Sequence, residues 1–234
     1  KMKNLKLVFN NLLKNYNLIY FRLLFVIIST FFFSKLYISY GTILGDGWAY
    51  NNLFINYSTG FVRRGLLGEI FLNLNEIYNI RPLYFFTNIL FVSYFFLIFF
   101  FYKMLKKYSE YKFFVTTITL SPALLLFYIY DLNVFLSKDV FINIAILFHV
   151  FVINRGISEK KYKKFLYFLL IPILTLNILN HENQVFFIPF HLLITLYYFS
   201  DKKSKLFTLG NLKPYFILII PIILILMSSG SFEK

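Results

Sequence analysis

The residues of this chain that can carry out acid–base or phosphate chemistry lie in gaps between its apolar runs. They are Asp46, Arg63, Arg64, Glu69, Asp131, Asp139, His181 and Glu182. Nearly every Lys lies in a different set of gaps, which alternates with the first along the chain. In a chain that crosses a bilayer repeatedly, alternate gaps face opposite sides. The sorting therefore predicts one aqueous face for electrostatic anchoring and another for chemistry.

Asp46 stands between two glycines, soon after the first long apolar run and just before Trp48. A carboxylate at this place can act as a general base toward a hydroxyl acceptor, or supply oxygen to a divalent cation. The alternative is a turn aspartate that hydrogen-bonds its own backbone. No second acidic residue adjoins Asp46 to complete a metal-binding pair.

Arg63 and Arg64 run against the charge pattern, because they lie on the lysine-poor face. Guanidinium groups form forked hydrogen bonds with phosphate, and a helix beginning just beyond them adds partial positive charge. We predict that the two arginines bind a lipid phosphate or pyrophosphate. The alternatives are ion pairs with Glu69 or Asp46, or contact with lipid headgroups.

Lys138 and Asp139 follow the third apolar run and are candidates to contact the same phosphate. Lys138 can also pair with Asp139 or with Asp131, and a solvated loop pair of that kind is common and contributes only about 0–1 kcal/mol. The sequence does not separate these two interpretations.

A polar segment at 180–184, Asn-His-Glu-Asn-Gln, separates two apolar spans. Consecutive hydrogen-bonding side chains at membrane depth are costly unless they face water or each other. His181 can transfer protons near neutral pH, with Glu182 as its partner. By contrast, His149 and His191 lie inside apolar runs, and we interpret them as helix-packing residues.

Composition indicates which elements must position these groups. The chain is 59% hydrophobic with a mean hydropathy of +0.68, and only 15% of its 234 residues are charged, whereas a soluble domain averages about 25% charged residues. Apolar stretches of roughly 20 residues recur, long enough to cross about 30 Å of hydrocarbon. We predict an all-α, polytopic transmembrane bundle that forms a single integral membrane domain over residues 1–234.

The net charge of +14 comes from basic residues in short loops that flank the apolar runs. Such residues set membrane orientation, which explains the charge better than nucleic-acid binding does. The lysine-rich gaps are then cytoplasmic, as is the N-terminus. The cysteine count of 0 excludes disulfides and thiolate metal sites.

About seven spans are predicted from the apolar runs. They cover residues 18–38, 82–102, 113–130, 141–154, 165–180, 185–199 and 214–227. The longest gap, 41–81, contains an apolar stripe at helical spacing from Leu66 to Ile77, which predicts an amphipathic helix lying in the outer interface. The last run stops shortly before Lys234, and we expect the protein to continue beyond it.

A resemblance rests on Ser-Thr-Gly-Phe-Val-Arg-Arg-Gly-Leu-Leu-Gly-Glu at 58–69, with Ser121-Pro122, Lys138-Asp139 and His181-Glu182. With these motifs the chain resembles uncharacterised inner-membrane proteins of bacterial surface-polysaccharide gene clusters. More loosely, its layout is similar to GT-C-type glycosyltransferases and to O-antigen polymerases. The likeness implies a multi-pass protein of the bacterial inner membrane, with Asp46 at the acidic catalytic position and Arg63 and Arg64 at the lipid phosphate.

The function expected from the residues and the resemblance is sugar transfer at the extracytoplasmic face. A polyprenyl-phosphate-linked sugar is the expected donor and a glycan the acceptor, with a divalent cation as an open possibility. Asp46 would be the base, and His181 and Glu182 would bind the acceptor or transfer protons. The alternatives are a lipid or polysaccharide transporter or flippase, and a non-enzymatic membrane component of a polysaccharide assembly complex.

Overall fold

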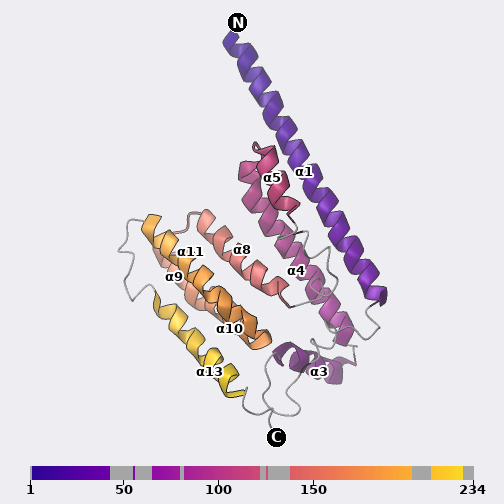
Figure 1. Cartoon of the computed structure of the whole chain (residues 1–234), viewed down its shortest axis with the longest axis vertical. Helices are drawn as coiled ribbons and strands as arrows, with labels where there is room; N and C mark the ends of the chain where they lie inside the picture. The colour runs from indigo at the N-terminus through magenta and orange to yellow at the C-terminus, as the bar shows by residue number, and fades with distance from the viewer. Residues whose placement is uncertain are drawn as a thin grey trace.

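The computed structural model describes residues 2–42, 55, 65–79, 82–121, 125, 138–201 and 212–228. Every regular element among them is helical (Figure 1). The α-helices are α1 (Met2–Thr42), α3 (Leu66–Tyr78), α4 (Pro82–Leu105), α5 (Lys112–Thr119), α8 (Val140–Asn154), α9 (Glu159–Phe165), α10 (Ile171–Asn180), α11 (Ile188–Asp201) and α13 (Ile219–Ser228). Short 3₁₀ segments are η1 (Lys106–Tyr108), η3 (Glu182–Phe187) and η4 (Lys213–Leu218), and η2 (Leu166–Leu170) is a π-helix.

The all-helical class is confirmed over the described residues, and three helical stretches are long and apolar enough to cross a membrane. They cover Asn15–Ile38, Tyr84–Tyr108 and Glu159–Asn180. Two shorter apolar helices, Val140–Asn154 and Lys213–Met227, coincide with predicted spans but are under 18 residues. The segment predicted at 113–130 begins with α5, and most of the remainder lies outside the described residues.

Helix α1 packs against α4 from Phe21 to Leu36 through a largely aromatic interface. The buried side chains of α1 recur every three or four residues, as expected for one face of a helix, and they are Phe21, Phe25, Ile28, Phe32 and Leu36. Ring pairs across this interface include Phe32 with Tyr94, whose centroids are 5.3 Å apart. The opposite face of α1 exposes residues such as Phe31, and an exposed apolar face of this kind is expected where lipid is the solvent.

The stretch from α9 to α10 is one helix in three parts, beginning earlier than the predicted start at residue 165. The π-helical segment η2 ends just before Pro172. Proline lacks an N–H and its ring crowds the carbonyl four residues earlier, so the preceding turn widens rather than keeping α-helical bonding. The helix survives because its buried face, including Leu166, Leu170 and Leu174, is packed in the core.

Helix α3 packs against α4 and α10 and lies crosswise to α4 at the foot of Figure 1. Its buried Phe71 meets Phe86 of α4, with ring centroids 6.2 Å apart. The helix ends at Asn79, whose positive φ of 51° puts it in the left-handed region that stops helices. A helix is therefore present within the 41–81 gap, over Leu66–Tyr78.

The bundle has two chemically different ends. The lysine-rich end is where α4 and α8 finish and α9 begins, and it carries Lys103, Arg155 and Lys160. The opposite, acidic end is where α8 begins and α10 finishes, near α3. The labels of α4, α8, α9 and α10 in Figure 1 locate the two ends.

Candidate functional site

Three of the predicted site residues come together at the acidic end, at the junction of α8, α10 and η3. The Nε2 atom of His181 lies 3.6 Å from Oδ1 of Asp139, and its Nδ1 lies 4.0 Å from Oε2 of Glu182. Asp139 is the residue that precedes α8, and His181 is the residue that follows α10. An imidazole between two carboxylates is a group that can accept and return protons.

The backbone determines which nitrogen of His181 carries the proton when the ring is neutral. The residue is extended, with φ −158° and ψ 113°, and its Nδ1 accepts a hydrogen bond from the backbone N–H of Asn183 at 3.3 Å. The accepting nitrogen has no proton, so in the neutral ring the proton resides on Nε2. That N–H is on the side of the ring nearer the Asp139 carboxylate.

The carboxylates differ in exposure, and this difference suggests different roles. The Asp139 side chain is 40% exposed, that of Glu182 is 19% exposed and that of His181 is 8% exposed. Asp139 is therefore the group that an incoming hydroxyl reaches most easily.

Lys138 is only 2% exposed, although it neighbours Asp139 in the chain. The solvated loop pair considered from the sequence therefore does not describe Lys138. Its burial also places its ammonium inside the protein rather than on the surface where a lipid phosphate would approach. A phosphate-binding role for Lys138 needs that residue to become accessible.

Asn177 links the two helices that bring Asp139 and His181 together. Its Nδ2 donates to the carbonyl of Phe141 in the first turn of α8 at 3.3 Å, and the backbone N–H of His181 donates to the Asn177 carbonyl at 2.9 Å. Asn177 is thus a positioning residue, which sequence reasoning missed because its side chain contacts a helix that is distant in the chain.

Asn180 adds a buried acceptor beside this junction. It is 7% exposed, and its Oδ1 has no hydrogen-bond partner among the described residues. A buried carbonyl oxygen without a donor is costly and is a place where a ligand hydroxyl is favoured. Asn180, His181 and Gln184 are buried, whereas Asn183 is exposed, so the polar segment faces both inward and outward.

The other predicted site residues cannot be placed at this junction. Asp46, Arg63, Arg64 and Asp131 lie outside the described residues. Glu69 is described on α3, where its Oε1 accepts a hydrogen bond from Asn73 Nδ2 at 3.3 Å. In the part of the chain that the structure describes, no group of three His, Cys, Asp or Glu residues is arranged to hold a metal ion.

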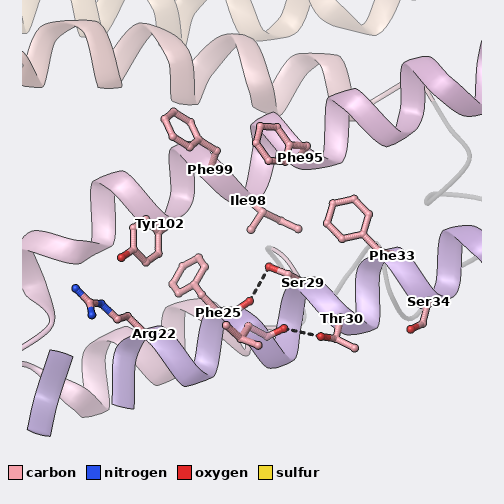
Figure 2. A pocket seen from close by; sticks show the side chains of 11 residues that line it. Arg22, Phe25, Ser29, Thr30, Phe33, Ser34, Phe95, Ile98, Phe99 and Tyr102 are labelled. Atoms are coloured by element: carbon pink, nitrogen blue, oxygen red, sulfur yellow. Dashed lines mark hydrogen bonds between the residues drawn. The ribbon is translucent and has the colours of Figure 1, made fainter. Parts of the chain in front are cut away.

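A groove of about 780 Å³ lies between α1 and α4 (Figure 2). Its lining is mostly aromatic and aliphatic, with Phe25, Phe33 and Phe95 among the residues drawn. The hydroxyls of Ser29 and Thr30 donate to carbonyls of their own helix, at 2.6 and 2.9 Å, so they add little polarity. None of the lining residues belongs to α8, α10 or η3, so the groove is separate from the Asp139–His181 junction.

A second histidine cluster is buried between α8, α9, α11 and η4. His149 Nδ1 lies 3.1 Å from His191 Nδ1, and His149 Nε2 lies 2.7 Å from the Tyr162 hydroxyl. Thr195 Oγ1 then bridges the hydroxyls of Tyr162 and Tyr215, at 2.9 and 2.7 Å. We call these five residues the buried network.

One proton arrangement satisfies almost every group in the buried network. The Tyr215 hydroxyl donates to the His191 carbonyl at 3.0 Å, so its proton is committed. Thr195 then donates to Tyr215, Tyr162 to Thr195, His149 Nε2 to Tyr162, and His191 Nδ1 to His149. Only His191 Nε2, an acceptor in this arrangement, lacks a partner among the described residues. Both rings are then neutral, as the predicted packing role requires.

Comparisons with protein-family models, with curated proteins and with solved structures find no match to this chain. The resemblance noted from the sequence motifs stays a prediction, and the functional argument rests on the geometry of the junction.

Proposed function

We propose that this protein is a membrane-embedded glycosyltransferase-like enzyme that transfers a sugar from a polyprenyl-phosphate donor during surface polysaccharide or glycan assembly. The observation that carries the proposal is the convergence of Asp139, His181 and Glu182 at one end of an apolar helical bundle. An acid–base group at the end of such a bundle meets a substrate whose reactive part is in water and whose tail is in lipid.

In the proposed step Asp139, the most exposed member, accepts the proton of an acceptor hydroxyl. The hydroxyl oxygen forms a bond to the anomeric carbon of the donor, and the bond from that carbon to the phosphate oxygen breaks. Polyprenyl phosphate leaves with the bonding electron pair. His181 Nε2–H stabilises the Asp139 carboxylate, and the backbone N–H of Asn183 holds the imidazole by its Nδ1. Glu182 is a second group at the junction that can take up a proton.

The leaving phosphate needs cationic partners, and Arg63 and Arg64 are the proposed ones. Asp46 is the alternative base, and a divalent cation bound there is compatible with the same step. In this arrangement the buried ammonium of Lys138 offsets the negative charge of Asp139 from within the protein.

The proposed orientation puts the lysine-rich end in the cytoplasm and the acidic end outside, in a bacterial inner membrane, with about seven spans in all. Helix α3 then lies in the outer interface, with Phe71 toward the bundle and Glu69 near the water. The groove between α1 and α4 supports a lipid-linked substrate, because its apolar lining offers a surface for an isoprenoid chain.

The test is a transfer assay on membranes that contain the protein, with radiolabelled polyprenyl-phosphate sugars as donors. We expect labelled glycan from the unaltered protein and a loss of about 10²–10⁴-fold in rate for Asp139→Asn, the range that general-base catalysis supplies. Glu69→Gln on α3 is the matched control, because it removes a carboxylate at the same end but away from the junction.

Three outcomes contradict the proposal. If Asp139→Asn and Glu69→Gln lower transfer equally, the junction is not the reacting centre. If labelled lipid moves between leaflets without any glycan product, the transporter or flippase alternative replaces the transferase. If every variant still assembles a polysaccharide complex and none shows transfer activity, the protein is a non-enzymatic component of that complex.

A further inference from the structure

A small basic pocket lies at the lysine-rich end, between the last turns of α4 and α8. Its volume is about 180 Å³, and it is lined by Lys103, Met104, Lys107, Phe151, Asn154 and Arg155. Pockets for drug-sized molecules measure roughly 300–1,000 Å³. This pocket therefore suits a headgroup rather than a whole lipid.

The lining carries three positive charges, and no carboxylate is among its described residues. Each cation lies over an aromatic ring: Lys103 Nζ is 5.4 Å from the Phe99 centroid, and Lys107 Nζ is 4.7 Å from that of Tyr108. The Arg155 guanidinium carbon is 4.8 Å from the Phe151 centroid. Over the part of the chain that the structure describes, none of the three forms an ion pair.

Positive charge at helix C-termini has an ordinary explanation, since it offsets the helix dipole. Each C-terminus carries about half a negative charge, so the ends of α4 and α8 together offset about one of the three cations. About two positive charges remain uncompensated around the pocket. Orientation alone requires basic residues in the loops, but it does not require three of them to converge on one cavity.

We propose that this pocket binds the phosphate headgroup of an anionic lipid in the leaflet at the lysine-rich end. Arg155 supplies the forked hydrogen bonds that suit phosphate oxygens, while Lys103 and Lys107 act as point charges. The exposed apolar side chains of α4 below the pocket, such as Phe96, offer contact for the acyl chains. The site is distant from the Asp139–His181 junction, so the proposal does not depend on the proposed enzyme activity.

The experiment measures binding of dioctanoyl phosphatidylglycerol by isothermal titration calorimetry to the whole chain in a neutral detergent. The pocket variant is Lys103→Gln, Lys107→Gln and Arg155→Gln together. The matched control is Lys160→Gln, Lys161→Gln and Lys164→Gln together, which removes the same charge from exposed positions of α9 outside the pocket. Circular dichroism checks that all proteins have the same helix content.

Each cation near an anionic lipid surface contributes about fivefold in affinity, so the pocket variant is expected to bind about 100-fold more weakly. The control is expected to change affinity less than fivefold. Arg155→Lys, which keeps the charge but loses the fork, should fall between the unaltered protein and the pocket variant. If the triple variant does not fold, Arg155→Lys alone tests the proposal.

Two further probes separate the sources of the phosphate. Dioctanoyl phosphatidylcholine, which carries no net charge, should bind at least tenfold more weakly than phosphatidylglycerol. Inorganic phosphate should compete only at much higher concentration, because it lacks the chains. Equal losses in the pocket and control variants overturn the proposal, and binding of inorganic phosphate as tight as that of the lipid reassigns the pocket to a soluble phosphate.

Discussion

The molecule contains two histidine clusters that differ in what surrounds the rings. At the acidic end, His181 lies between two carboxylates, and one of them is 40% exposed. In the buried network, the rings of His149 and His191 are fully buried, and their polar partners are each other and the Tyr162 hydroxyl. The carboxylate beside the first ring faces water, whereas charging a ring of the buried network would bury an uncompensated ion.

The contrast shows that residue type alone does not identify a reactive histidine. All three histidines are adjacent to apolar spans, and all three are at least nine-tenths buried. What separates them is the charge and exposure of the partner, since a solvent-facing carboxylate provides a route for protons and a buried tyrosine hydroxyl does not. In the proposed function the acidic junction is the reacting centre, and the buried network is expected to stabilise the bundle.

The sharpest difference is expected in chemical accessibility, which can be tested because the chain contains 0 cysteines. Asp139→Cys should react fully with a water-soluble maleimide in the folded protein, and Thr195→Cys should not react until the protein is denatured. Mass spectrometry of the labelled protein measures both. Equal labelling of the two variants under native conditions would mean that the buried network is open to water.

A large difference is also expected in catalysis. His181→Gln should lower sugar transfer by about 10²–10⁴-fold while leaving the melting temperature nearly unchanged. His149→Gln should instead lower the melting temperature in detergent, and its transfer rate should fall only in proportion to the folded fraction. The transfer assay and circular dichroism on the same preparations separate the two, and the comparison fails if both variants lose activity while fully folded.

A smaller effect is expected when the buried network loses a single group. Thr195→Val keeps the shape but leaves the Tyr162 proton without its acceptor and Tyr215 without its donor. The free energy of unfolding should fall by about 1–3 kcal/mol, as for a buried polar group left unsatisfied. Unfolding by denaturing detergent, followed by circular dichroism, measures this change, and a neutral result would show that the network adds no stability.

The smallest effect serves as the reference for that measurement. Tyr20 and Thr116 also share a hydroxyl pair, 2.7 Å apart, but it is only partly buried between α1 and α5. Thr116→Val should change the free energy of unfolding by less than about 1 kcal/mol, because water can replace the lost partner. A loss as large as that of Thr195→Val would remove burial as the explanation.

Much of the fold followed from local sequence, while parts of the site did not. The apolar stretches Asn15–Ile38 and Tyr84–Tyr108 match the predicted spans 18–38 and 82–102 closely, because continuous apolar runs of sufficient length have few alternatives in a membrane. Helix α1 itself begins much earlier, at Met2. The start of the 159–180 helix was placed too late, because Lys160 to Lys164 were read as a loop although Tyr162 faces the core. The burial of Lys138 was not predicted either, because it depends on packing between elements that are distant in the chain.

The sequence by itself indicated a membrane protein and divided the gaps between apolar runs into a lysine-rich set and an acidic set. It also showed that His181 and Glu182 form a polar break between two apolar runs. These properties depend on composition and on the length of apolar runs, which are local. The tertiary structure alone decided that Asp139 meets His181, that Asn177 ties α10 to α8, and that His149 and His191 share a closed network. These contacts join residues far apart in the chain, and helix packing rather than local preference determines them.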